Sequence, residues 1–214
     1  MDNIERKKKY QPFQEQNIIE KYNPNFIVEI ISELESNTEN FVVDVGQHQM
    51  WAAQSLNMKA HQRFLTSGGL GAMGFSLPTA IGISSATKER TVVILGDGCA
   101  QLNTNELETI KYYNLPVSIY IINNMQHGMV AQFQEENLKS NFIGTRFGYS
   151  VPDFVKIAEA YGIKALKVKN SEDLELMATT RNQTNYGPVL FDILIKQDYK
   201  ALPKVGKKVK LSDL

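Results

Sequence analysis

The chain has 214 residues, with 23 lysine and arginine side chains against 23 aspartate and glutamate side chains, and 43% of its residues are hydrophobic. This length fits one large α/β domain with a tail at each end better than two complete domains. Because the formal net charge is zero, nothing attracts the whole chain to nucleic acid or to an anionic membrane, and neither is expected as a partner.

Cysteine occurs once, at Cys99, which excludes an intrachain disulfide and a metal site built from several thiolates. The N-terminal residues are charged where a secretory signal needs an apolar stretch, and no run reaches the roughly 18 apolar residues of a membrane span. We therefore expect a cytoplasmic protein in a reducing compartment.

The N-terminal residues 1–22 are polar and are predicted to form a connector. Apolar residues at helical spacing then predict a short amphipathic helix over residues 26–34, with Asn23-Pro24 as its start signal. Uninterrupted apolar runs, typical of strands buried on both faces of a parallel sheet, follow at residues 41–43, 91–95, 117–122 and 189–195.

Helical segments are predicted between these runs, at residues 78–86, 103–113 and 154–161. The repeated alternation of strand and helix predicts an α/β fold with a doubly wound, mostly parallel sheet flanked by helices. This domain is expected to span residues 23–203, and the lysine-rich residues 204–214 are expected to form an exposed tail.

Three loops could carry chemistry, because ligands of open parallel sheets bind in the loops at the ends of the strands. The first loop, residues 44–51, places amides, the imidazole of His48 and the indole of Trp51 within reach of a ligand. His48 could equally cap a helix, and Trp51 could fill the core. The loop alone does not decide between these interpretations.

The second loop, residues 66–74, is rich in glycine and leads into an apolar helix whose first turn contains Pro78. Gly69, Gly71 and Gly74 match the dinucleotide fingerprint G-x-G-x-x-G, but that fingerprint requires a preceding strand, and residues 61–64 are a poor candidate for one. Close packing of the chain is therefore the favoured interpretation, and a nicotinamide site is the weaker alternative.

The third loop follows the strand at 91–95 and reads Gly96-Asp97-Gly98, and the next strand ends at Asn123-Asn124. Adjacent parallel strands bring these ends together. The carboxylate of Asp97 and the amide oxygen of Asn124 are ligands suited to Mg²⁺, which usually completes its coordination with phosphate oxygens and water. The pattern predicts a phosphorylated ligand, with two ordinary turns as the alternative.

The helix between these two strands is predicted to begin near Asn103, with Asn103 and Glu106 spaced as a capping box. Its N-terminal amides would then point toward the same phosphate region.

The third loop resembles the diphosphate-binding motif of thiamine diphosphate enzymes. Residues 44–54, 65–74 and 128–130 are similar to segments of one family in particular, the C-terminal, pyrophosphate-binding domain of the acetolactate synthase (acetohydroxyacid synthase) large subunit. The resemblance extends from about residue 25 to residue 195.

This resemblance implies a site for thiamine diphosphate and Mg²⁺. Its metal ligands would be Asp97, the side chain of Asn124 and the backbone carbonyl of Gln126. The cofactor would contact Gly46, Gln47, His48, Gly71, Met73, Gly96, Gly98, Cys99, His127, Gly128 and Met129. Within this set, the carbonyl of Gly71 would accept from the 4′-amino group, Met73 would wedge between the two rings, and the amides of residues 127–129 would meet the diphosphate.

Two residues depart from the family pattern, since Cys99 stands where serine is usual and Phe133 where tryptophan is common. No catalytic residue is expected in this chain, because in the family the activating glutamate comes from the N-terminal, pyrimidine-binding domain of a partner subunit. No segment resembles that domain or the middle domain that binds FAD, so FAD is expected only in the complete enzyme. The chain is expected to be a fragment or half of a split enzyme, and incomplete alone.

The resemblance implies a homo-oligomeric transferase that decarboxylates pyruvate and joins the remaining two-carbon unit to a second 2-oxoacid. A related decarboxylase, or a carboligase that makes a branched sugar or another specialised product, remains an alternative. A module that has kept the fold and lost catalysis is a third interpretation.

Overall fold

The computed structural model describes residues 22–202. The predicted connector, apart from Tyr22, and the predicted tail lie outside these residues. Tyr22 is attached to the sheet, because its hydroxyl donates to the carbonyl oxygens of Val168 (3.1 Å) and Leu194 (2.8 Å).

The centre of the fold is a sheet of six strands in the order β2-β1-β3-β4-β6-β5, and every neighbouring pair is parallel. The strands are β1 (Asn40–Val43), β2 (Arg63–Leu65), β3 (Thr91–Gly96), β4 (Val117–Asn123), β5 (Lys164–Val168) and β6 (Val189–Leu194). The chain moves from β1 to β2 on one side and then returns past β1 to β3 on the other. The order therefore reverses between β1 and β3, and ligands of such sheets bind at the carboxyl ends beside this reversal.

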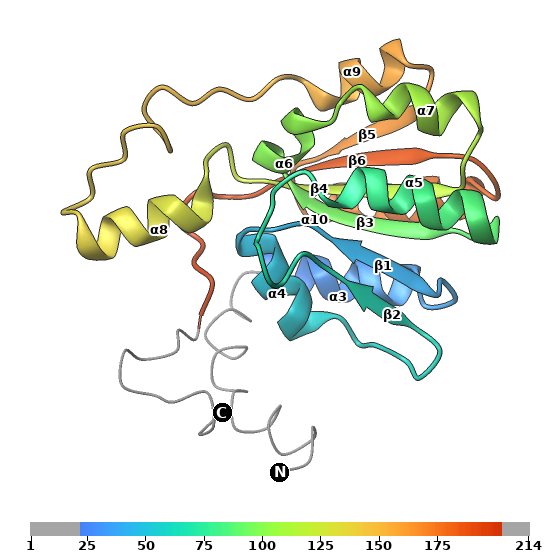
Figure 1. The fold of residues 1–214 in the computed structure, drawn as a ribbon, viewed down its shortest axis with the longest axis horizontal. Helices are drawn as coiled ribbons and strands as arrows, with labels where there is room; N and C mark the ends of the chain where they lie inside the picture. The colour runs from blue at the N-terminus through green and yellow to red at the C-terminus, as the bar shows by residue number, and fades with distance from the viewer. Residues whose placement is uncertain (1–21, 203–214) are drawn as a thin grey trace.

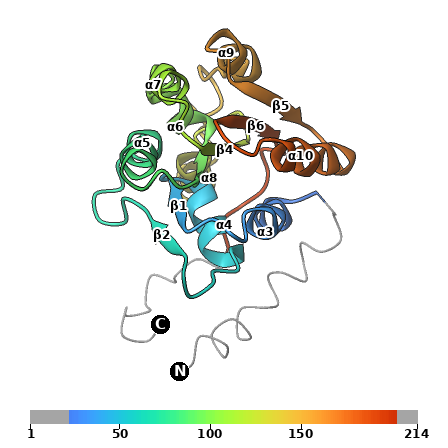
Figure 2. The same ribbon diagram turned by 90° about the vertical axis from the view of Figure 1, so that its right-hand side faces the viewer.

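Helices cover both faces of the sheet (Figures 1 and 2). One face carries α3 (Pro24–Leu34), α4 (Gln47–Ser55) and α10 (Ser171–Gln183), and the other carries α5 (Ser76–Thr87), α6 (Asp97–Leu102), α7 (Glu106–Tyr112) and α9 (Phe154–Ala160). The remaining helix, α8 (Gly128–Asn137), extends beyond the carboxyl ends of the strands (Figure 1). Within residues 22–202, every helix is too short or too polar to cross a membrane.

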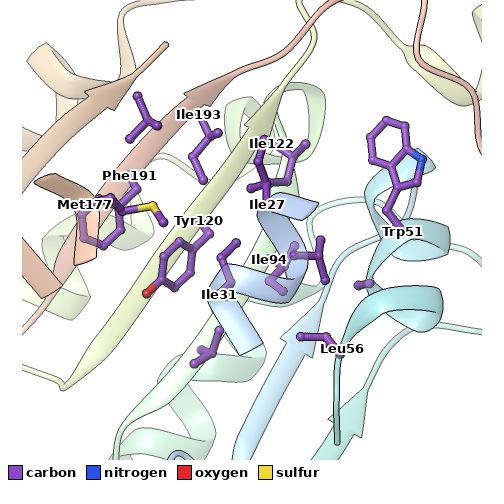
Figure 3. Packing of buried hydrophobic residues seen from close by; sticks show 14 of the residues in the cluster. Ile27, Ile31, Trp51, Leu56, Ile94, Tyr120, Ile122, Met177, Phe191 and Ile193 are labelled. Atoms are coloured by element: carbon purple, nitrogen blue, oxygen red, sulfur yellow. The ribbon is translucent and has the colours of Figure 1, made fainter. Parts of the chain in front are cut away.

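Successive residues of the central strands point to opposite faces of the sheet, so they contribute to two hydrophobic cores, one on each face. Ile94 and Tyr120 face α3, whose Ile27 and Ile31 are fully buried against the sheet (Figure 3). The intervening residues of the same strands, such as Ile119, pack under α5, α7 and α9. Because both faces are covered, these strands are mostly apolar, which explains their long hydrophobic runs.

The four strands and four helices predicted from the sequence are present. The first helix begins at Pro24, capped by the side chain of Asn23, which accepts from the amide of Phe26 at 2.9 Å. Pro78 lies in the first turn of α5, as expected. The sequence did not predict β2, β5, α4, α6, α8 or α10. The edge strands β2 and β5 are half-exposed, and the helices α4 and α10 carry little apolar periodicity.

The predicted capping box is wrong. A separate short helix, α6, begins directly at Asp97, and the next helix begins at Glu106 without a side-chain cap. The Asn103 side chain instead donates to the carbonyl of Gly74. It therefore connects the turn between α6 and α7 to the glycine-rich loop of residues 66–74, which we call the glycine loop. The segment before that loop also differs from expectation, since Arg63–Leu65 forms a short strand, although at the exposed edge of the sheet.

A buried ion pair between Glu35 and Arg181 lies at the end of the fold opposite the carboxyl ends of the strands. Glu35, at the end of α3, accepts two hydrogen bonds from Arg181 of α10 and one from the hydroxyl of Tyr120 (2.8 Å). Burial alone would raise the pKa of Glu35, but the hydrogen bonds and the charge of Arg181 outweigh burial and hold this pKa below its usual value. The pair joins two helices that lie on the same face of the sheet.

We expect Glu35→Gln to lower the free energy of unfolding at pH 7 by about 3–5 kcal/mol, because it leaves the Arg181 guanidinium without its counter-charge. Since the folded pKa of Glu35 lies below the unfolded one, the ion pair stabilises the protein fully above the ordinary pKa of 4.5, and less as the pH falls through the folded pKa. Urea unfolding at several pH values should therefore show the difference between the two proteins shrinking in acid. The exposed Glu33→Gln is the matched control, and an equal loss in both variants would contradict the prediction.

Candidate cofactor site

One cavity of about 440 Å³ lies at the carboxyl ends of β1, β3 and β4. Every residue predicted to bind the metal or the cofactor lines this cavity: Gly46, Gln47, His48, Gly71, Met73, Gly96, Asp97, Gly98, Cys99, Asn124, Gln126, His127, Gly128 and Met129. The individual contacts of these residues with a ligand remain predictions. Trp51 lines the same cavity and is also part of the core, as the structural interpretation of this residue predicted.

Three oxygen atoms converge at the ends of β3 and β4. The side-chain oxygen of Asn124 lies 3.3 Å from Oδ1 of Asp97 and 2.9 Å from the carbonyl oxygen of Gln126. All three are hydrogen-bond acceptors, so they repel one another unless a cation lies between them or the amide of Asn124 rotates. Neighbouring oxygen ligands of octahedral Mg²⁺, each bound at 2.0–2.1 Å, lie about 2.9 Å apart. The spacing therefore fits a small hard cation.

The carboxylate of Asp97 is buried and held in place from its other side. Oδ2 accepts from the hydroxyl of Tyr149 at 2.7 Å, and that hydroxyl accepts from the side chain of Gln101 at 3.0 Å. Burial raises the pKa of Asp97 to about 6, although the hydrogen bond from Tyr149 opposes the shift. A cation beside Oδ1 would offset the cost of burying this charge. Sequence reasoning missed Tyr149 and Gln101, because nothing in their spacing relates them to Asp97.

One ring nitrogen of His48, Nε2, is buried and lacks a hydrogen-bond partner among the described residues. Its ring lies between Gly46, in the loop after β1, and Gly96, the last residue of β3, since a Cβ built on either would lie 2.8 Å or 2.9 Å from it, respectively. Burial lowers the pKa of His48 to about 4, which leaves the imidazole neutral near pH 7. Among the residues that the structure describes, Nε2 of His48 has no hydrogen-bond partner. An orphaned polar atom in the wall of a cavity indicates a ligand that bonds to it.

The first turn of α8 supplies backbone amides to the cavity. Gly128 and Met129 open this ten-residue helix, and the first N–H groups of a helix have no intrahelical acceptor. The amide of His127, which was also predicted to meet a diphosphate, donates to the carbonyl of Thr145 at 3.1 Å and is therefore used within the chain. The amides of Gly128, Met129 and Val130 in this first turn are left for an anionic ligand.

The thiol of Cys99 also has a hydrogen-bond partner within the chain. It donates to the carbonyl of Val45 at 3.2 Å, and burial raises its pKa above the usual value for cysteine. The residue is therefore a neutral thiol in the wall of the cavity.

The glycine loop is fixed to the end of β1 by Asp44. One carboxylate oxygen accepts from the amide of Gly74 at 3.0 Å, and the other accepts from the amide (2.9 Å) and the hydroxyl (2.6 Å) of Ser76. Gly71 has a φ of +65° and Gly74 a φ of +81°, which other residues rarely adopt. These contacts place Met73, 40% exposed, at the cavity. The close-packing interpretation thus accounts for Gly74, and the position of Asp44 explains how the loop is held.

Comparisons with known proteins agree with this geometry. The family model described as "Thiamine pyrophosphate enzyme, C-terminal TPP binding domain" matches residues 44–193. The chain is 39% identical over 189 residues to "Acetolactate synthase 2, chloroplastic" of Nicotiana tabacum, 41% over 185 residues to "Acetolactate synthase large subunit" of Pyropia yezoensis, and 36% over 211 residues to "Acetolactate synthase 1, chloroplastic" of Zea mays.

These matches cover 85%, 86% and 95% of this chain but only 28%, 31% and 33% of the respective relatives. The chain thus corresponds to about a third of each relative's length. The matched segment contains the carboxylate of Asp97, the amide of Asn124 and the first turn of α8. The chain belongs to the family of C-terminal, thiamine pyrophosphate-binding domains of thiamine pyrophosphate enzymes.

Proposed function

We propose that this chain binds thiamine diphosphate through a Mg²⁺ ion held by Asp97, Asn124 and the carbonyl oxygen of Gln126. The convergence of these three oxygens at neighbouring strand ends is the observation that carries the proposal. Each would bind the cation on one side, and the diphosphate would bind it on the other. No group of three histidine, cysteine, aspartate or glutamate side chains that could hold a metal occurs within residues 22–202, so the proposed site relies on one carboxylate together with an amide and a carbonyl oxygen.

The remaining residues of the cavity would bind and orient the ligand. The amides of Gly128 and Met129 would donate to phosphate oxygens. Nε2 of His48 would donate to them in the protonated form of the ring, which a neighbouring anionic phosphate favours. Met73 and the carbonyl of Gly71 lie on the glycine loop and would contact the rings. When bound, thiamine diphosphate supplies the chemistry that breaks and forms carbon–carbon bonds, and the protein supplies position and electrostatics.

We propose further that the chain supplies one half of an acetolactate synthase-type active site in the cytoplasm. A pyrimidine-binding domain would cover the cavity and provide the activating glutamate, and FAD would belong to the complete enzyme. Exposed apolar side chains around the cavity support such a cover, because large exposed apolar patches mark interaction surfaces. Met50, Met73 and Val130 line the cavity, and the exposed Leu70 and Phe133 lie on the glycine loop and on α8, two segments that contribute to its wall. The substrates of the complete oligomer would be pyruvate and a second 2-oxoacid.

Ligand-induced stabilisation tests the binding proposal. Saturation at 100 times the dissociation constant should raise the free energy of unfolding by about 2.7 kcal/mol, because the ligand binds only the folded state. We expect the melting temperature of the chain to rise with millimolar Mg²⁺ and thiamine diphosphate together. Thiamine diphosphate with a chelator is the control. The same melting temperature in both samples would favour a module that has kept the fold and lost the cofactor.

A substitution of Asp97 tests the metal site itself. Asp97→Asn keeps the shape of the side chain but removes the charge that a divalent cation requires, so the Mg²⁺-dependent rise in melting temperature should disappear. Glu108→Gln, which removes one exposed negative charge from α7, should leave the rise intact. A titration that shows Mg²⁺ binding equally well to both variants would place the cation elsewhere.

An activity assay separates the complete enzyme from this part of it. The chain alone should form no acetolactate from pyruvate, because no activating glutamate is expected in it. Once the complementary domain is supplied, pyruvate alone and pyruvate with 2-oxobutyrate should both yield carboligation products. Release of acetaldehyde without carboligation would favour the decarboxylase alternative.

A further inference from the structure

A segment after β6 is held by its backbone across two helices of the site. Residues 199–202, which we call the carbonyl strap, run between α4 and α8 (Figure 1). Each of its four consecutive carbonyls accepts from a side chain: Tyr199 from Gln47 (3.1 Å), Lys200 from Trp51 (3.3 Å), Ala201 from Gln132 (3.2 Å) and Leu202 from Gln54 (2.5 Å). None of these bonds depends on the side chains of the strap.

The side-chain amide of Gln132, on α8, is hydrogen-bonded to the carbonyl strap in a single orientation. Its Oε1 accepts from the amide of Ala201 at 3.0 Å, and its Nε2 donates to the carbonyl of the same residue. A backbone N–H can only donate and a carbonyl can only accept, so the two ends of the Gln132 amide cannot be exchanged. The side chain is 3% exposed, which leaves little room for water to replace these partners.

The fixed oxygen of Gln132 in turn orients Gln47. Nε2 of Gln47 donates to Oε1 of Gln132 at 2.9 Å and to the carbonyl of Tyr199. Both partners are acceptors, so the oxygen of Gln47 must face the other way, where it accepts from Nδ2 of Asn124 at 3.0 Å.

This series of bonds determines which atom Asn124 presents to the cation site. If its amide were rotated, its oxygen would lie 3.0 Å from Oε1 of Gln47, with no proton between the two oxygens. The oxygen of Asn124 therefore faces Asp97 and Gln126. The bond between Gln47 and Asn124 also lies tightly under α8, because a Cβ on Gly128 would overlap both amides.

We propose that the carbonyl strap, acting through Gln132 and Gln47, positions the side-chain oxygen of Asn124 as a cation ligand. Gln132 is a positioning residue, since it contacts neither the proposed metal nor the cofactor. This inference rests on the proposed function, because it requires that Asn124 binds the cation. Partners that orient metal ligands typically contribute 10- to 100-fold to metal affinity.

Three variants of the whole chain test the proposal. Gln132→Met keeps the approximate length of the side chain but removes both ends of the amide. Gln132→Glu keeps an acceptor for Gln47 and for the amide of Ala201, and burial favours its protonated form, which donates to the Ala201 carbonyl. Gln134→Met is the matched control, since Gln134 lies on the same helix and its two hydrogen bonds, with Ile143 and Thr145, are outside this series.

The probe is Mn²⁺ with saturating thiamine diphosphate. Electron paramagnetic resonance of free Mn²⁺ gives the affinity, and proton relaxation gives the number of waters on the bound ion. We expect Gln132→Met to lower the affinity by roughly 10- to 100-fold and to add a water where Asn124 leaves. Gln132→Glu and Gln134→Met should remain near the wild-type values in both measurements.

A second variant keeps the test informative if Gln132→Met does not fold. Gln132→Asn keeps an amide but is one methylene too short to bridge Gln47 and Ala201, and it should show the same loss of affinity and the same added water. Wild-type affinity and hydration in the folded Met or Asn variant would overturn the proposal, as would an equal loss in Gln132→Glu. In both cases binding to the wild-type chain would leave the proposed function standing. If the wild-type chain binds neither Mn²⁺ nor thiamine diphosphate, the proposed function itself fails.

Discussion

The parallel pairing of β3 with β4 is the constraint on which the site depends. The two strands are paired residue by residue, with Gly96 beside Ile122, so the carboxylate that follows one strand lies next to the amide that follows the other. A shift of one residue would turn the side chains of β4 to the opposite face and would separate Asp97 from Asn124. The apolar residues on both faces of these strands make such a shift costly. The packing of the core thus fixes the geometry of the proposed cation site.

Much of the fold could be predicted from the sequence, because its central strands are buried on both faces. Runs such as Thr91–Gly96 have few alternatives, and the polar residues at their carboxyl ends predicted where a ligand would bind. The edge strands could not be predicted in this way. Arg63–Leu65 is short and half-exposed, and β5 places Lys164 and Lys167 among its apolar residues.

The contacts that orient the site could not be predicted either. Asp44 holds the glycine loop through Gly74 and Ser76, and Tyr149 reaches Asp97 from 52 positions away in the sequence. Such contacts depend on how distant segments pack and leave no periodic pattern. The same holds for the amide of Gln132, whose orientation is set by a backbone group 69 residues further along the chain. The family resemblance predicted residues that line the cavity, and the structure was needed to identify the residues that hold them.

The environment of Cys99 has a practical consequence for spectroscopy. A thiol that is 2% exposed, with a raised pKa and a carbonyl acceptor at Val45, forms little thiolate at neutral pH and should react slowly with maleimides. It is also the only native thiol in the sequence. A cysteine introduced at an exposed position should therefore accept a fluorophore or a spin label selectively, without prior removal of Cys99 from the wall of the cavity.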